Sequence, residues 1–244
     1  FRRTFRFLSR QLARFVPPRI SHMVGIVLSV LLFWAWIDGV LFAFVLRTAD
    51  QSFQQLDALI EDDLPRPSRP EQTGSAESLV DWQQLGRQGR RFVSGGPDAA
   101  DLSAFFGTPT PAPLRVYVGL NSADTPEQRA RLALEELKRA GGFDRSVLLL
   151  VTPTGTGWVD EASQDPAEYL FRGDVATVAV QYSYLNSPLA LLTQAAYGAE
   201  NARAVFVEIY GYWSALPADA RPRLYLSGLS LGSLNSDLSF NLFD

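Results

Sequence analysis

The sequence predicts an α/β fold with a doubly wound, mostly parallel sheet, preceded by an amphipathic helix and a transmembrane helix. From residue 114 onward, segments with strand and helix patterns alternate, and the strand segments are continuous apolar runs. Such runs are typical of parallel strands that are covered on both faces. The expected organisation is a basic amphipathic segment at 1–19, a transmembrane helix at 20–46, a helix and proline-rich linker at 47–74, and the first part of the α/β domain at 75–244.

The apolar stretch at residues 23–46, MVGIVLSVLLFWAWIDGVLFAFVL, carries one formal charge, Asp38, and no proline. At about 1.5 Å per residue it covers roughly 36 Å, enough to cross a hydrocarbon core of about 30 Å. A cleavable signal peptide is not favoured, because the apolar run is too long and has no small-residue cleavage site. Asp38 favours a hydrogen bond to another helix over an ion path, which indicates that this helix has neighbours.

The charge distribution predicts the orientation of this helix. Residues 1–19 carry six arginines and no acidic residue, whereas the whole chain has a net charge of −4. By the positive-inside rule, the N-terminal flank is cytoplasmic and residues 47–244 are periplasmic. Residues 1–16 place apolar side chains at spacings of three or four between the arginines, as in a helix that lies at the headgroup boundary. Membrane lipid and other transmembrane helices are the expected partners, and the acidic main domain argues against nucleic acid.

Residue counts exclude several kinds of chemistry. The chain has no cysteine, which excludes disulfides, thiolate catalysis and cysteine metal sites. With one histidine and no paired-ligand spacing, the sequence predicts neither a metal nor a cofactor. The chain begins with Phe1 rather than methionine, so we expect a fragment of a longer polypeptide.

Local patterns predict the individual elements. Thr125 and Pro126, with Gln128 three residues after the threonine, mark a helix start. The basic run at 85–92, LGRQGRRF, favours a solvated face over a site for anionic lipid or substrate. The expected strands are 114–120, 145–152, 177–184 and 222–227, and the expected helices are 48–61, 126–140, 166–171 and 189–214, with an extended linker at 63–75 and small helices within 75–106.

The segment Gly228-Leu229-Ser230-Leu231-Gly232 directly follows the last expected strand and precedes a stretch with helical potential. This pattern is that of a nucleophile elbow, a sharp strand-to-helix turn that strains the serine backbone and needs glycines where side chains would clash. It predicts Ser230 as the nucleophile, Gly228 and Gly232 as the elbow glycines, and the N–H of Leu231 as one oxyanion donor.

The loop Pro153-Thr154-Gly155-Thr156-Gly157-Trp158 follows the strand at 145–152. Its glycines permit close approach of backbone to a substrate oxygen, so Thr154, Gly155 and Thr156 are candidates for the oxyanion hole. A phosphate-binding turn or a plain turn is the alternative, although the loop lacks the lysine of a P-loop. Candidate pocket residues, for which core or rim packing is an equally good interpretation, are Trp158, Gln181, Tyr182 and Tyr184.

Several longer runs carry a resemblance, among them RVYVGLNSADTPEQRA, FDRSVLLLVTPTGTGWVD, VAVQYSYLNSPLALL and WSALPADARPRLYLSGLSLGS. Through them the chain resembles, over nearly its whole length, a bacterial family of integral-membrane α/β-hydrolases with an N-terminal multi-helix membrane domain. The resemblance implies a place in the bacterial inner membrane, a parent that extends in both directions, and residues 20–46 as the last membrane helix. At Leu229 an acidic residue is expected; leucine keeps the elbow possible and changes the pocket or the strand packing.

A serine nucleophile needs an imidazole that a carboxylate orients, in the order serine, acid, histidine in this fold. After Ser230 the chain offers only Asp237 and Asp244 as acids, and its one histidine, His22, is expected at the cytoplasmic end of the membrane helix. We therefore expect a membrane-anchored serine hydrolase, esterase- or lipase-like, that acts on an unidentified acyl compound and takes its triad acid and histidine from the rest of the parent. The alternatives are a non-catalytic structural or assembly subunit of a membrane complex, and a domain that binds a ligand without turnover.

Overall fold

The structure is a computed structural model that describes Val24 and residues 26–34, 52–59, 61, 64–185 and 187–240, without the side chains of 187–189 and 191–195. The chain divides into two compact units, Phe1–Ser52 and Phe53–Asp244. In the first unit, residues 26–34 are helical and most of their side chains are exposed. None of the helices within the described ranges combines the length and hydropathy that a bilayer crossing requires. The basic segment 1–19, His22, Asp38, Asp244 and most of the expected span 20–46 lie outside the described residues.

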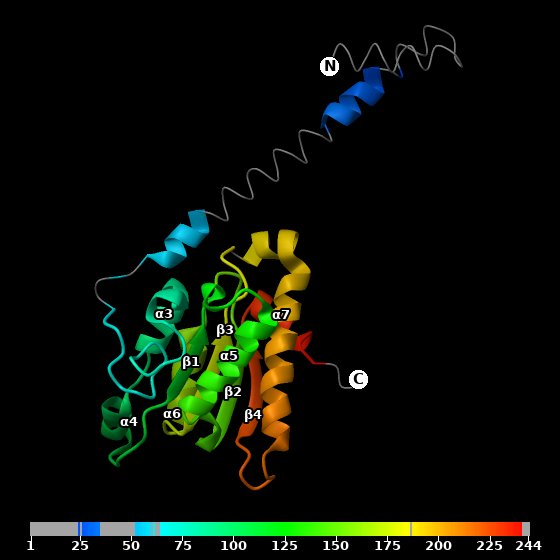
Figure 1. Cartoon of the computed structure of the whole chain (residues 1–244). Coiled ribbons are helices and arrows are strands. Elements are labelled where there is room, and N and C mark those ends of the chain that lie inside the picture. Colours follow the sequence, from blue (N-terminus) through cyan, green and yellow to red (C-terminus); the bar gives the residue numbers. More distant parts are fainter. Residues whose placement is uncertain are drawn as a thin grey trace. The chain divides into compact units, whose positions relative to one another are not determined.

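The second unit is built on a sheet of four parallel strands in the spatial order β1-β3-β2-β4 (Figure 1). Every residue of the first three strands is buried, which explains their continuous apolar sequences. β4 is at the edge of the sheet and alternates exposed and half-buried residues near its start. This confirms the expected parallel α/β sheet. The strands are β1 Leu114–Val118, β2 Val147–Thr152, β3 Val175–Val180 and β4 Arg223–Gly228.

The helices begin where the sequence offers capping side chains. Thr125 accepts a hydrogen bond from the Gln128 N–H, and the Gln128 side chain accepts one in return from the Thr125 N–H, so α5 starts at Pro126 as expected. Asp98 and Asp101 form the same reciprocal cap on α4. The helices are α3 Gly86–Ser94, α4 Ala99–Phe106, α5 Pro126–Arg139, α6 Glu161–Leu170, α7 Ser187–Ala215 and α8 Leu231–Asp237, with short 3-10 turns η1 Trp82–Leu85, η2 Leu120–Ser122 and η3 Gly142–Asp144.

Right-handed crossovers distribute these helices over the two faces of the sheet. The steps from β1 to β2 and from β3 to β4 run in the same direction across the sheet, so α5 and α7 lie on one face, where they pack side by side (Figure 1). The step from β2 to β3 runs back, which places α6 on the other face. Arg115 of β1 contacts Phe92 of α3 and Glu168 of α6, so α3 shares that second face.

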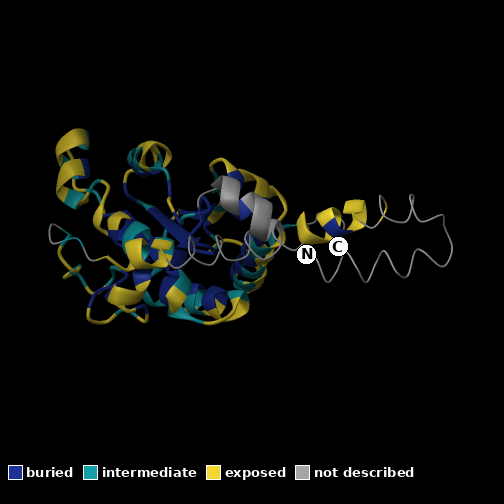
Figure 2. Cartoon of the chain, turned by 90° about the horizontal axis from the view of Figure 1, so that it is seen from above, coloured by how far each residue is buried: buried dark blue, intermediate teal, exposed yellow. Residues whose placement is uncertain are grey.

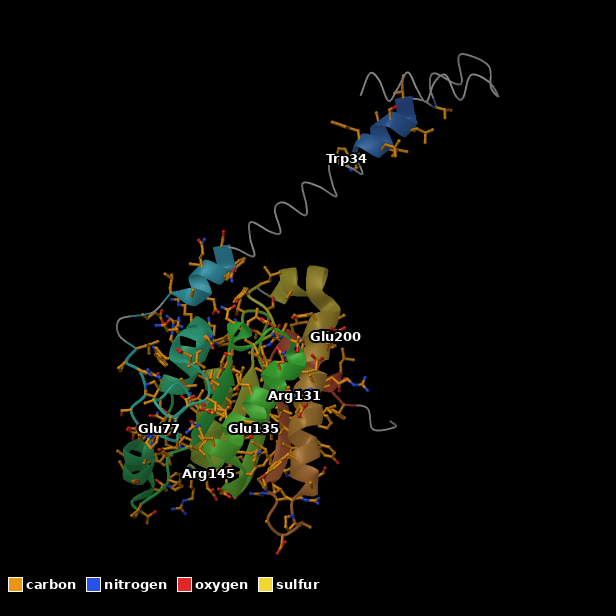
Figure 3. The ribbon with its side chains drawn as sticks, viewed as in Figure 1. Trp34, Glu77, Arg131, Glu135, Arg145 and Glu200 are labelled. Atoms are coloured by element: carbon orange, nitrogen blue, oxygen red, sulfur yellow. The ribbon has the colours of Figure 1, made fainter. Side chains whose placement is uncertain are left out.

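The sheet is the buried centre of this unit, and the outer faces of the helices are exposed (Figure 2). Charged side chains occupy those outer faces, including Arg131 and Glu135 on α5 and Glu200 on α7 (Figure 3). The core between the sheet and α5 contains alanines and leucines such as Ala130, Ala133 and Leu137, which are fully buried.

Three expectations about local structure are wrong. β3 ends at Val180 rather than at 184, because its partner β1 ends there; the N–H of Gln181 still bonds to Val118 O, and the chain then leaves the sheet. α6 begins at Glu161 rather than near 166, since Asp160 caps the Ala162 N–H and Pro166 is accommodated inside the helix. The basic run of α3 is only in part a solvated face, because Arg90 is only 1% exposed, whereas Arg91 is exposed.

The proline-rich linker belongs to the second compact unit. Residues 64–75 contain no regular helix or strand, in agreement with the expected extended linker. The linker is nevertheless folded, because Arg66 donates hydrogen bonds to the carbonyls of Gly74 and Ser75, and Thr73 is fully buried.

Candidate active site

The carboxyl ends of the four strands meet at one edge of the sheet, where open α/β sheets bind their ligands. β2 and β4 are neighbours, and Thr152, the last residue of β2, pairs with Gly228, the last residue of β4. The expected oxyanion loop after β2 and the expected elbow after β4 therefore leave the sheet side by side. The sequence separates these two segments by about 75 residues, and the strand pairing brings them together.

Ser230 has an unusual backbone conformation, with φ 55° and ψ −124°. Among the described residues other than glycine, only Ser230 and Arg172 have positive φ. L-residues rarely adopt this conformation, which is the strain that a nucleophile elbow requires. Ser230 is exposed, and α8 begins at the next residue, with the Ser230 carbonyl accepting a hydrogen bond from the Ser233 N–H at 3.0 Å. The turn thus presents the serine side chain at the carboxyl edge of the sheet.

The two glycines of the turn lie where no side chain would fit. A Cβ atom on Gly228 would lie 2.5 Å from the carbonyl carbon and oxygen of Gly232. A Cβ atom on Gly232 would lie 2.3 Å from the carbonyl oxygen of Thr152 and 2.8 Å from that of Pro153. All these are backbone atoms, which cannot rotate away. Gly232 therefore allows the start of α8 to pack directly against the point where the oxyanion loop leaves β2.

The loop after β2 closes on itself in a tight turn. The N–H of Thr154 donates to Trp158 O at 3.0 Å, and the N–H of Gly157 donates to Thr154 O at 2.9 Å. Gly157 has φ 86°, in the region that favours glycine. Within the described part of the chain, the N–H groups of Gly155, Thr156 and Leu231 donate no hydrogen bond. Of the groups expected to donate to an oxyanion, these three are free to do so, while the Thr154 N–H is already engaged.

Two buried side chains hold this loop from inside the domain. The hydroxyl of Tyr117, on β1, donates to Gly157 O at 2.8 Å, and the side-chain amide of Gln181 donates to Thr156 O at 3.3 Å. Both residues are fully buried. Tyr117 is not among the site residues predicted from the sequence. Its position in an apolar strand could have indicated such a role, because a buried tyrosine hydroxyl usually has a hydrogen-bond partner.

The candidate pocket residues lie in different environments. Tyr182 is buried against Leu185 and Leu231, and burial raises the pKa of its hydroxyl to about 12. Tyr184 and Thr156 line a cavity of about 200 Å³, together with Phe53, Leu56, Asp57, Arg87 and Gln88. Trp158 is 39% exposed at the end of the loop, and Leu229 is exposed on the elbow.

The described residues do not supply a base for Ser230. No acidic side chain among them forms a hydrogen bond with the Ser230 hydroxyl, and Asp237 is exposed at the far end of α8. The same residues contain no group of three or more histidine and acidic side chains with the arrangement of metal ligands.

Comparison with known proteins identifies the fold family. The model of the family described as "Alpha/beta-hydrolase family" matches residues 114–244, more than half of the chain, and the model described as "Alpha/beta-hydrolase family N-terminus" matches residues 1–97. No curated protein and no solved structure matches the chain. The family match begins at the first residue of β1 and includes the whole sheet, the loop after β2 and the turn at Ser230. The chain therefore belongs to the alpha/beta-hydrolase family.

Proposed function

We propose that the protein is a serine hydrolase that cleaves an acyl ester or a related acyl compound through an acyl-enzyme at Ser230. The observation that carries this proposal is the backbone of Ser230, which is strained at φ 55° and exposed beside the loop that contains Gly155 and Thr156. A plain turn at the end of an edge strand has no need of such a conformation, because glycine would adopt it without strain.

In the proposed reaction, a base removes the proton of the Ser230 hydroxyl as the oxygen attacks the acyl carbonyl carbon. The carbonyl oxygen becomes an anion that accepts hydrogen bonds from the N–H groups of Leu231, Gly155 and Thr156. The intermediate collapses with cleavage of the bond to the leaving group, which takes up the proton from the base. Water then attacks the acyl-serine by the same route, releasing the acid and restoring Ser230. The base and its orienting acid lie outside the described residues.

A fluorophosphonate probe tests the proposal, because it reacts with an activated serine and leaves a stable adduct. We expect stoichiometric labelling of the full-length protein, loss of labelling in Ser230→Ala, and unchanged labelling in Ser227→Ala, which removes a nearby hydroxyl on β4. If the folded full-length wild type is not labelled, the hydrolase proposal is wrong. The alternative, a structural or assembly subunit of a membrane complex, would then be favoured.

We further propose that residues 20–46 anchor the protein in the bacterial inner membrane, with the hydrolase domain on the periplasmic side. The apolar length of the segment and the arginines before it support this proposal, as do the exposed large apolar side chains on the helix at 26–34, such as Leu31 and Trp34. Residues 1–244 contain no cysteine, so single cysteines introduced among them can be compared directly. In intact cells with a permeable outer membrane, a maleimide that cannot cross the inner membrane should label Arg131→Cys, whereas Arg10→Cys should react only after lysis. The reverse pattern would contradict the proposed orientation.

A further inference from the structure

The oxyanion loop depends on Gln181, whose side-chain amide is fully buried. Its oxygen accepts a hydrogen bond from the Leu120 N–H at 3.2 Å, so its nitrogen is the atom that faces the loop. Its nitrogen faces three acceptors, namely Ser183 O at 3.1 Å, Thr156 O at 3.3 Å and the Asp57 carboxylate at 3.4 Å. Gln181 therefore connects the loops that follow β1, β2 and β3, and joins them to a segment that precedes the sheet.

Asp57 belongs to the helical residues 52–58, far from the hydrolase strands in the sequence. One of its carboxylate oxygens accepts a hydrogen bond from the Arg87 N–H at 3.1 Å, at the start of α3, and the other accepts from Gln181. Gly86 leaves the space for this carboxylate, since a Cβ atom there would lie 2.4 Å from a carboxylate oxygen. Burial of the carboxyl raises the pKa of Asp57, and the hydrogen bond from Gln181 opposes this shift.

Asp57, Leu59 and Glu61 are held against the domain by the arginines of α3. Arg90, which is almost fully buried, donates to the carbonyl oxygen of Asp57 at 3.1 Å, and also to that of Leu59. Arg87 and Arg91 both form ion pairs with Glu61, at nitrogen–oxygen distances of 2.7 Å and 2.5 Å. The basic run of α3 thus fixes this segment in place, and the segment supplies the carboxylate that Gln181 faces.

We propose that Asp57 is a positioning residue for the oxyanion loop: its carboxylate orients the Gln181 amide, which holds the Thr156 carbonyl and so directs the free N–H groups of the loop. The proposal rests on the proposed hydrolase function. Only a group that accepts on both sides fits between the Arg87 N–H and the amide nitrogen of Gln181. An asparagine at position 57 has the same size and keeps one acceptor oxygen. Its NH₂ group, however, would face either the Arg87 N–H or the Gln181 amide nitrogen, both of which are donors.

Glu61 provides a matched control. It lies near Asp57 in the sequence and its ion pairs with Arg87 and Arg91 also attach it to α3, but it makes no hydrogen bond to Gln181 or to the loop. If Asp57 acts only by docking the segment, Glu61→Gln should affect the loop in the same way as Asp57→Asn. If Asp57 acts through Gln181, only Asp57→Asn should do so.

The experiment combines hydrogen–deuterium exchange of the peptide covering 153–159 with ester hydrolysis by the full-length protein. In Asp57→Asn we expect exchange of this peptide to rise about tenfold and kcat to fall at least about tenfold with KM nearly unchanged, since loss of one oxyanion donor lowers kcat 10²–10³-fold. In Glu61→Gln both quantities should match wild type. Wild-type exchange and kcat in Asp57→Asn, or equal changes in both variants, would overturn the proposal.

Gln181→Met is a second route to the same answer if Asp57→Asn does not fold. It removes the amide while keeping a side chain of similar length, and it should reproduce the faster exchange of the loop and the lower kcat. Unchanged exchange in Gln181→Met would also overturn the proposal. If the wild type fails to react with a fluorophosphonate, the hydrolase function is wrong, while the exchange measurements still decide whether Asp57 positions the loop.

Discussion

The strain at Ser230 leads to a prediction about stability that does not depend on any substrate. A non-glycine residue in such a sparsely populated conformation costs about 1–3 kcal/mol. Glycine adopts the same backbone angles without this penalty, but loses about 0.5–1 kcal/mol more in backbone entropy on folding. We therefore expect Ser230→Gly to unfold with a free energy about 1 kcal/mol higher than Ser230→Ala, which keeps the strain.

The comparison between these two variants isolates the backbone, because both lack the hydroxyl. Ser230 is exposed, so removal of the hydroxyl itself should change the free energy of unfolding by less than about 0.5 kcal/mol. Urea unfolding of the second compact unit measures the difference, and for a unit of this size 1 kcal/mol corresponds to about 2–4 °C in Tm. If the free energy of unfolding of Ser230→Gly is no higher than that of Ser230→Ala, the inference that the Ser230 backbone is strained is wrong.

Three further predictions concern packing and charge. Gly232→Ala should lower the free energy of unfolding by about 1–3 kcal/mol and abolish probe labelling, because its Cβ meets the Thr152 carbonyl; Gly211→Ala, on the open face of α7, should instead raise that free energy by about 0.5–1 kcal/mol in the same denaturation assay. Glu168→Gln should cost about 3–5 kcal/mol, measured by urea titration, because it leaves the buried Arg115 without its closest carboxylate; a loss below 1 kcal/mol would contradict this. The hydrogen bonds from Arg91 and Arg87 lower the pKa of Glu61 to about 2, below its ordinary 4.5, so the carboxylate stabilises the fold above pH 4.5 and this contribution is lost as the pH falls towards 2. The difference in Tm between wild type and Glu61→Gln should close over that interval, and a difference that widens would show that the sign is wrong.

The elbow was predictable because its requirements are local. A turn of this shape places the serine backbone at positive φ and brings residues two positions to either side into backbone contact, so the serine and both glycines appear in five consecutive residues. The strands and the capped start of α5 were predictable for the same reason, since apolar runs and capping side chains act over a few residues.

The support of the oxyanion loop was not predictable, because it depends on contacts between distant segments. Asp57 and Gln181 are separated by more than a hundred residues, and neither carries a local pattern that marks the other as its partner. The arginines of α3 have the spacing of a solvated helix face, whereas Arg90 is buried and donates to the carbonyls of Asp57 and Leu59, which are distant in the sequence. The end of β3 was missed because the length of its partner β1 sets it, while the tyrosines at 182 and 184, a residue type common in strands, follow directly.

The central claim is that Ser230 forms a covalent acyl intermediate, and mass spectrometry of the quenched reaction tests it most directly. The full-length protein would be mixed with a p-nitrophenyl ester, acidified within the first turnover and digested. We expect an acyl group on the peptide that contains Ser230, formed together with a burst of about one equivalent of nitrophenol. Ser230→Ala should show neither the acylated peptide nor the burst. Turnover without an acylated Ser230 peptide, or an acyl group on another residue, would contradict it.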